Sequence, residues 1–146
     1  MPTTTGHVGI NVTSLDRSHD FYADVFQLTR IGGSDDAGRR FAFLGDGERL
    51  VLTLWEQSDG RFDGRTPGLH HLSFEVASMD DVRAAEERLR ARGATFAYEG
   101  IVPHREGAQS GGIFFEDPDG TRLEIYAKDG TSGAAPVAGA PTCGFF

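Results

Sequence analysis

The fold is decided by the stretch Phe114-Phe115-Glu116-Asp117-Pro118-Asp119-Gly120-Thr121-Arg122-Leu123-Glu124-Ile125-Tyr126. Its Asp-Pro-Asp-Gly segment favours a tight turn, because proline presets φ and glycine accepts positive φ. Aromatic residues precede the turn and an alternating run follows it, so the stretch predicts a β-hairpin. Along the second strand, Leu123 and Ile125 share the apolar face, and the opposite face carries Arg122, Glu124 and Tyr126. A carboxylate is therefore held on a rigid strand, on the face away from the core.

This hairpin is part of a pattern that occurs twice in the chain. His71-Leu72-Ser73-Phe74-Glu75-Val76 aligns without a gap on His7-Val8-Gly9-Ile10-Asn11-Val12, and both segments alternate as strands do. Ala77-Ser78-Met79-Asp80 aligns on Thr13-Ser14-Leu15-Asp16, and each of these segments precedes a predicted helix. We expect the first helix to end near Phe26 and the second to cover residues 79–92.

The hairpin aligns as well, and this completes the repeat. Phe115 through Asp119-Gly120 and Leu123 correspond to Phe43 through Asp46-Gly47 and Leu50, which makes Val51 the equivalent of Glu124. The chain is therefore predicted to be an α+β protein of two tandem β-α-β-β-β modules. We expect a single domain over residues 1–127, with module one at about 6–56, a linker at 57–68 and module two at about 69–127. Residues 128–146 form a tail rich in Gly, Ala and Pro, which the terminal Phe145-Phe146 could anchor.

The composition narrows the range of partners. The 146 residues carry a formal net charge of −8 and no basic run, which argues against nucleic acid and anionic membrane surfaces. No apolar run approaches the length of a transmembrane helix, and the initial Met-Pro-Thr-Thr-Thr is unlike a signal peptide. The single cysteine, Cys143, excludes an internal disulfide and a cysteine-based zinc cluster. We expect a cytoplasmic protein whose partner is a small molecule.

Two histidines and one carboxylate fall on equivalent faces of the modules. His7 and His71 are equivalent in the repeat, and both lie on the face opposite the apolar residues that pack against the helix. Glu124 lies on the same face of its own strand. Two imidazoles and one carboxylate on rigid strands, open to solvent on one side, form a typical donor set for Fe, Mn, Ni or Zn. His70 lies one position before His71, so it faces the other way unless a β-bulge exchanges the two.

Other polar and aromatic residues are candidates for roles around that site. His104 lies in a loop at residues 103–107 that could cover a pocket, and either His104 or Glu56 could move a proton. A solvated loop histidine is an equally good interpretation of His104. Substrate contacts are expected from Asn11, Trp55, Arg122 and Tyr126. Ordinary packing is the alternative for the two aromatic residues, and pairing with a carboxylate is the alternative for Arg122.

Residues 6–128, approximately, resemble a known superfamily, and four segments carry the resemblance. They are His7-Val8-Gly9-Ile10-Asn11-Val12, Phe21-Tyr22-Ala23-Asp24-Val25-Phe26-Gln27-Leu28, Gly68-Leu69-His70-His71-Leu72-Ser73-Phe74 and residues 115–124. Together they resemble the vicinal oxygen chelate superfamily, which includes glyoxalase I, fosfomycin- and bleomycin-resistance proteins, and extradiol dioxygenases. The resemblance implies an open, incompletely closed, eight-stranded barrel-like sheet around a divalent metal ion, with His7, His71 and Glu124 as ligands. It also implies a homodimer.

The sequence departs from particular members of that superfamily. Glyoxalase I-like members carry a fourth ligand where the repeat places Val51, and Glu56 could replace it only through a bulge or a break in alternation. Small extradiol dioxygenases carry a tyrosine where this chain has Phe114, so an expected proton donor is missing. They also carry an upstream histidine, for which His104 is available at a slightly longer spacing.

Three function hypotheses follow from these observations. The leading one is a divalent-metal-dependent lyase, isomerase or thiol-transfer enzyme whose small substrate chelates the metal through adjacent oxygens. One alternative is a bleomycin-resistance-like protein that sequesters a drug or metabolite without metal, and an acidic chain suits a cationic ligand. The other alternative is an Fe(II) extradiol-type dioxygenase in which Trp55, Phe43 and Tyr126 line an aromatic pocket.

Overall fold

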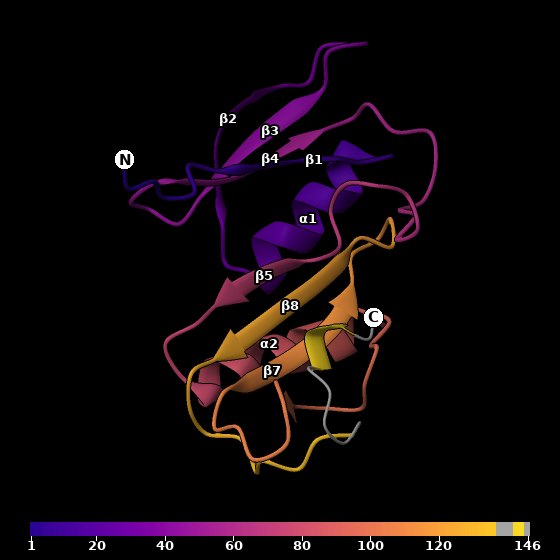
Figure 1. The fold of residues 1–146 in the computed structure, drawn as a ribbon. Coiled ribbons are helices and arrows are strands. Elements are labelled where there is room, and N and C mark those ends of the chain that lie inside the picture. Colours follow the sequence, from indigo (N-terminus) through magenta and orange to yellow (C-terminus); the bar gives the residue numbers. More distant parts are fainter. Residues whose placement is uncertain (137–141, 145–146) are drawn as a thin grey trace. The chain divides into compact units, whose positions relative to one another are not determined.

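The computed structural model describes residues 1–136 and 142–144. The chain divides into two compact units, Met1–Arg61 and Phe62–Phe146. Each unit contains a four-stranded mixed sheet and one α-helix that covers one face of it (Figure 1). Within the described residues, every helix is too short or too polar to cross a membrane.

The first unit consists of β1 (Val8–Asn11), α1 (Leu15–Val25), β2 (Thr29–Ser34), β3 (Phe41–Gly45) and β4 (Leu50–Trp55). Its strand order is β1-β4-β3-β2, in which β1 and β4 are parallel and the other neighbours are antiparallel. Parallel neighbours need a crossover connection, and α1 begins the crossover between β1 and β4.

The sequence of α1 explains both its start and its buried face. Ser14 is the N-cap residue, and its side chain accepts a hydrogen bond from the backbone N–H of Arg17. Leu15, Phe21 and Val25 are almost fully buried and recur at helical spacing, so they form one apolar stripe. The sheet side of this core consists of Ile10, Ala42, Leu44, Leu52 and Leu54. The alternate residues of the strands therefore lie on the opposite face of the sheet.

The second unit repeats this arrangement with β5 (Leu72–Glu75), α2 (Met79–Ala91), β6 (Val102–Pro103), β7 (Gly111–Glu116) and β8 (Arg122–Ala127). Its strand order is β5-β8-β7-β6, again with the first two strands parallel. A capping box starts α2, because the side chains of Ser78 and Asp81 each accept from the other's backbone N–H. Gly93, with φ of 68°, follows the end of α2.

The predicted hairpin joins β7 to β8. One carboxylate oxygen of Asp117 accepts from the backbone N–H groups of Asp119 and Thr121, at 2.8 and 2.9 Å. Gly120 has φ of 85°, a conformation that glycine adopts without strain. The turn sets a register in which Phe114 lies directly opposite Glu124, so both side chains are on the face away from α2.

The strand register corrects the sequence alignment of the two modules. Gly9 pairs with Thr53, whereas the equivalent pair in the second unit is Ser73 with Glu124. The equivalent of Glu124 is therefore Thr53 and not Val51. The sequence alignment matched Asp46-Gly47 with Asp119-Gly120, but these two pairs occupy different positions within their turns, which are of equal length. A β-bulge after Leu44 adds to the irregularity of the first turn. Threonine, like valine, offers no carboxylate as a fourth ligand.

The predicted α+β architecture of two β-α-β-β-β modules is confirmed. The sequence did not reveal β2, because Thr29–Ser34 lacks an alternating apolar pattern and its pairing with β3 shifts register between Arg30 and Gly32. In the tail, Thr142–Gly144 forms a short 3-10 helix, η1. The predicted anchor Phe145-Phe146 lies outside the described residues. The domain and linker boundaries stay predictions.

Candidate functional site

His71 and Glu124 meet on the sheet face of the second unit that lies opposite α2. His71 immediately precedes β5, and Glu124 is the third residue of the neighbouring strand β8. Nε2 of His71 lies 3.5 Å from Oε2 of Glu124. Because β5 and β8 are hydrogen-bonded along their length, the backbone holds both side chains in place.

His70 contacts the far side of the His71 ring. The two Nδ1 atoms are 2.8 Å apart, so one imidazole donates to the other and Nε2 of His71 is the nitrogen that faces Glu124. Burial lowers the pKa of His71, the Glu124 carboxylate opposes this effect, and His70 adds to the lowering. A lowered pKa favours the neutral imidazole at pH 7, which is the form that binds a metal ion.

His104 reaches the same carboxylate from the loop after β6. Its Nε2 lies 2.6 Å from Oε1 of Glu124, and its Nδ1 lies 3.0 Å from Oγ of Ser110. A carboxylate only accepts, so Nε2 donates, and in the neutral ring Nδ1 accepts from the Ser110 hydroxyl. Each oxygen of Glu124 therefore faces a different histidine. This explains why Glu124 is only 3% exposed, although it lies on the face away from the helix.

The polar face continues along β8 to Tyr126. Its ring packs against the ring of His104 with 5.1 Å between centroids, and its hydroxyl donates to Oε2 of Glu75 at 2.7 Å. The hydrogen bond to Glu75 raises the pKa of Tyr126 to about 12, and burial adds to this. Lys128 forms an ion pair of 2.7 Å with the other oxygen of Glu75. The Tyr126 phenol is therefore protonated at neutral pH and held in one direction.

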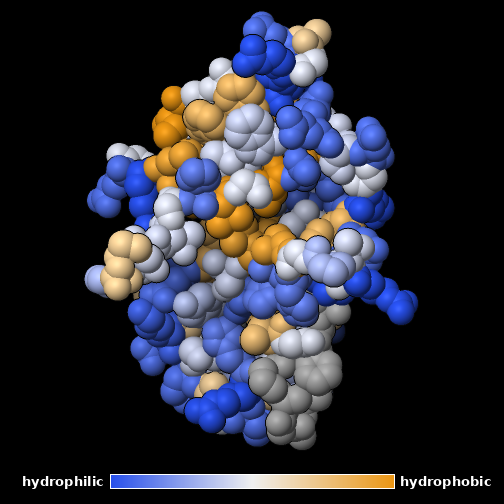
Figure 2. Space-filling model, turned by 45° about the horizontal axis from the view of Figure 1, so that its top comes forward, coloured by the Kyte–Doolittle hydropathy of each residue, from blue (hydrophilic) through white to orange (hydrophobic). Residues whose placement is uncertain are grey.

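The face of the first unit's sheet opposite α1 is largely aromatic. The rings of Phe41 and Trp55 stack with 4.8 Å between centroids, and Phe43 meets Trp55 edge-on at 6.1 Å. The indole N–H of Trp55 donates to Oγ1 of Thr53 at 2.9 Å. All three rings are half-buried. On the face of the molecule in view, Figure 2 shows hydrophobic residues gathered in one broad area among mostly hydrophilic ones. A ligand on this face would meet ring surfaces.

His7 and Asn11 lie at the two ends of β1, and both are exposed. His7 is the residue before β1, as His71 is the residue before β5. Asn11 is the register partner of Trp55, so its amide lies beside the aromatic face. Both residues are thus free of the core of the first unit and available to a ligand.

Glu56 and Arg122 are already engaged within their own units. Oε2 of Glu56 accepts from the backbone N–H of Leu15 at 2.6 Å and lies 3.4 Å from the guanidinium of Arg40. This carboxylate therefore stabilises the N-terminus of α1. The guanidinium of Arg122 lies over the ring of Phe62, 5.9 Å from its centroid.

The His71–Glu124 pair fits a divalent metal ion but does not complete a site. Two ligands at about 2.1 Å from one ion are about 3.4 Å apart when they subtend a tetrahedral angle. The observed distance of 3.5 Å agrees with this, and it is long for a good N–H···O hydrogen bond. In the part of the chain that the structure describes, no group of three His, Cys, Asp or Glu side chains is assembled that could hold a metal ion. The pair therefore supplies two donors, and a metal site here would need a third ligand.

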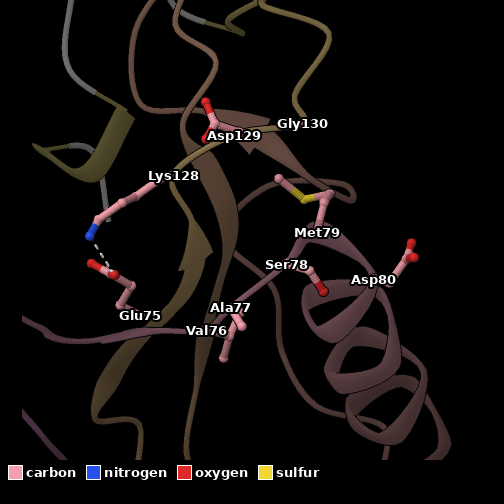
Figure 3. A pocket seen from close by; sticks show the side chains of 9 residues that line it. All are labelled: Glu75, Val76, Ala77, Ser78, Met79, Asp80, Lys128, Asp129 and Gly130. Atoms are coloured by element: carbon pink, nitrogen blue, oxygen red, sulfur yellow. Dashed lines mark ion pairs between the residues drawn. The ribbon is translucent and has the colours of Figure 1, made fainter.

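A separate open hollow of about 580 Å³ lies beside the N-terminus of α2. Figure 3 shows Glu75 and Lys128 at one side of it and Met79 and Asp80 at the other. Glu75 and Lys128 pair with each other, and the capping box already uses Ser78. None of the residues that line the hollow is one of the histidines or Glu124. The hollow is therefore distinct from the candidate metal site.

Comparison with known proteins identifies the family. The model of the Glyoxalase/Bleomycin resistance protein/Dioxygenase superfamily matches residues 4–125. The chain belongs to this superfamily. Among its relatives in the superfamily, lactoylglutathione lyase of Haemophilus influenzae is 33% identical over 136 residues, which cover 86% of this chain and 93% of that protein.

Two solved structures carry the same fold. A glyoxylase/bleomycin resistance protein/dioxygenase domain from Frankia sp. EAN1pec has a TM-score of 0.73 and 29% identity, over 88% of this chain and 99% of that chain. The fosfomycin resistance protein FosX of Listeria monocytogenes, complexed with Mn(II) and sulfate, has a TM-score of 0.64 and 23% identity, over 90% of this chain and 96% of that chain. At that identity, the second likeness shows the fold alone.

The structure also adds residues that the sequence did not suggest. Ser110, Glu75 and Thr142 carry no motif. Ser110 acts through a hydrogen bond within the loop that carries His104, whereas Glu75 and Thr142 bond to residues distant in the sequence. His70, in contrast, could be suspected from the sequence, because it directly precedes His71. Thr142 moreover lies outside the superfamily match, which ends at residue 125.

Proposed function

We propose that this protein is a divalent-metal-dependent enzyme of the superfamily that acts on a small molecule bearing two adjacent oxygen donors. His71, Glu124 and His7 would hold the metal. The observation that carries the proposal is the distance of 3.5 Å between Nε2 of His71 and Oε2 of Glu124 on two hydrogen-bonded strands. Imidazole nitrogen and carboxylate oxygen suit Fe, Mn, Ni and Zn, and the choice among these ions rests with measurement.

The bound ion would act as a Lewis acid that polarises the chelating oxygens of the substrate. The chain's own residues have separate tasks. His104 donates to Oε1 of Glu124 and so keeps Oε2 turned toward His71. When the Glu124 contact is released, Nε2 of His104 is a group that can move a proton. Trp55 and Asn11 would contact the remainder of the substrate.

His7 is assigned as the third ligand by its place before β1, which repeats the place of His71 before β5. A single chain could supply all three ligands, or a homodimer could combine His7 of one chain with His71 and Glu124 of the other. We propose the homodimer as the assembly. Analytical ultracentrifugation of wild-type protein tests this, and a monomer that binds metal stoichiometrically would contradict it.

An Fe(II)-dependent extradiol-type dioxygenase is the second candidate. Two observations favour it, namely the His104 imidazole at the carboxylate and the half-buried rings of Phe41, Phe43 and Trp55. Phe114 counts against it, because this fully buried ring lies directly opposite Glu124 where a phenol is expected.

Elemental analysis of protein purified without a metal-affinity tag tests the proposal. We expect about one divalent ion per His71–Glu124 pair. Iron would lead to assays of oxygen uptake with catechols, and nickel, manganese or zinc to lyase, isomerase and thiol-transfer substrates. Protein that contains no metal and takes up none of these ions would contradict the proposal and support metal-free sequestration of a drug or metabolite.

A further inference from the structure

Thr142, in the C-terminal tail, is anchored to the chain segment that carries His104. Its backbone N–H donates to the carbonyl of His104 at 2.8 Å, and its hydroxyl donates to the carbonyl of Pro103 at 2.6 Å. Its own carbonyl accepts from the Tyr98 hydroxyl at 3.1 Å. Thr142 is fully buried. Both backbone groups and the side chain of one residue are therefore used for docking.

An earlier part of the tail holds the same loop from its other end. The hydroxyl of Thr131 donates to the carbonyl of Ala108 at 2.5 Å, and the backbone N–H of Thr131 donates to Gln109. The backbone N–H of Gly107 donates to the carbonyl of Gly133 at 2.7 Å. We call residues 131–135 and 142–144 the strap. The strap therefore contacts the loop at both ends, at residues 103–104 and at residues 107–109.

The loop between the two anchors has few bonds of its own. His104 donates its backbone N–H to Ser110 at 3.0 Å, and Ala108 donates to Arg105. His104 directly follows Pro103, which pairs with Gly111 of β7, so its hydrogen bond to Ser110 continues the β6–β7 ladder. The hydrogen bond of Ala108 lies within the loop and fixes only its shape. The strap's anchors therefore add constraints that position the His104 backbone, and with it the ring that reaches Glu124.

We propose that the strap is part of the functional site and that Thr142 is a positioning residue, which holds His104 in hydrogen-bonding distance of Glu124. Its effect on metal binding rests on the proposed function, whereas its effect on His104 does not. The superfamily match ends at residue 125, before the strap begins.

Cys143 provides a built-in reporter of the docked strap. It follows Thr142, is half-buried, and is the single cysteine of the chain. Burial raises the pKa of its thiol, and the Glu124 carboxylate raises it further. Release of the strap would expose this thiol and take it away from that negative charge, so its reaction with Ellman's reagent would become faster.

The test compares Thr142→Val, which loses the hydroxyl at nearly constant size, with Thr142→Ser, which keeps it. Thr66→Val is the matched control, because the Thr66 hydroxyl donates to the carboxylate of the exposed Asp63. We expect Cys143 to react about tenfold faster in Thr142→Val, because the buried Pro103 carbonyl loses its partner. The rates of Thr142→Ser and Thr66→Val should stay within about twofold of wild type. If Cys143 reacts at the wild-type rate in Thr142→Val, the proposal that Thr142 anchors the strap is wrong.

A second readout, the imidazole ¹⁵N spectrum at fixed pH, separates positioning from mere docking. We expect the His104 signals to shift in Thr142→Val and to recover in Thr142→Ser, while the His19 signals stay constant. Faster thiol reaction with unchanged His104 signals would overturn the positioning role. Thr131→Val loosens the other anchor and should change both readouts in the same direction, so the proposal is testable even if Thr142→Val does not fold.

Mn(II) affinity, measured on the same variants, links the strap to the proposed function. We expect about a tenfold loss in Thr142→Val, in line with the loss of a residue that orients a ligand. If wild-type protein binds no metal while both other readouts respond, the strap stands and the proposed function fails. If metal binds equally well in wild type and Thr142→Val, the strap's link to the metal site is overturned.

Discussion

Glu124 presents one carboxylate oxygen to His104, with 2.6 Å between Oε1 and Nε2. Its second oxygen faces His71 at 3.5 Å. The short contact is a charge-assisted hydrogen bond, and the long one leaves room for an ion between the two side chains. One buried carboxylate thus has a partner that orients it and a partner that could share a metal with it.

Replacement of His104 tests this division of roles. His104→Phe keeps a ring in the loop but removes the donor to Glu124. We expect Mn(II) affinity, measured by isothermal titration calorimetry, to fall about 10- to 100-fold, as for other residues that orient a metal ligand. Ser110→Ala removes only the partner of Nδ1 and should cause a smaller loss. Equal affinities in His104→Phe and wild type would show that Glu124 needs no orienting donor.

Replacement of Glu56 should affect stability and not metal binding. Glu56→Gln weakens a hydrogen bond of 2.6 Å to the N-terminus of α1 and the ion pair with Arg40. We expect the free energy of unfolding, measured in urea, to fall by about 1–2 kcal/mol, because a charged acceptor of a backbone N–H is lost. Glu48→Gln, at an exposed position, is the control. Lost metal affinity with unchanged stability would instead make Glu56 a ligand.

Tyr126 should ionise only at very alkaline pH. Its pKa is raised from 10.0 to about 12, chiefly by the hydrogen bond to Glu75. A raised pKa means that the folded state favours the protonated phenol. The resulting stabilisation is complete below pH 10 and is lost as the pH rises from about 10 to about 12.

Absorbance at 295 nm measures this ionisation. The difference between wild type and Tyr126→Phe should show a transition near pH 12, and in a Glu75→Gln background the transition should move toward pH 10. A wild-type difference transition at pH 10 would mean that the Tyr126–Glu75 hydrogen bond does not form in solution.

Much of the fold follows from local sequence patterns. The strand before each helix, a polar segment suited to capping each helix, and the hairpin between β7 and β8 all have local signals, and the structure contains each of them. The sequence did not single out the cap residues, which the structure identifies as Ser14 and Ser78. The register of β4 could not be predicted from the sequence, because an Asp-Gly pair indicates a turn but does not fix the position of the pair within that turn. The equivalence of Thr53 with Glu124 appeared only from strand pairing.

The site was predictable only in part. The alternation of β8 predicted that Glu124 faces away from the helix, and the repeat predicted that His71 lies on the same face. The structure brings the two side chains together, and their role as metal ligands stays a prediction. The sequence could not predict the contact of His104 with Glu124, because that contact depends on a loop that follows the short strand β6 and is held by hydrogen bonds to residues 131 and 142. Threonine in a Gly- and Ala-rich tail carries no signal for such docking.

The most direct measurement of the central claim is a Mn(II) titration of four single variants: His7→Gln, His71→Gln, Glu124→Gln and the control His19→Gln. If the first three residues hold one metal ion together, each of their variants should lose at least about 100-fold in affinity, while His19→Gln stays at the wild-type value. Circular dichroism would establish that each variant is folded. Wild-type affinity in folded Glu124→Gln or His71→Gln would contradict the account, and wild-type affinity in His7→Gln would remove His7 from the site.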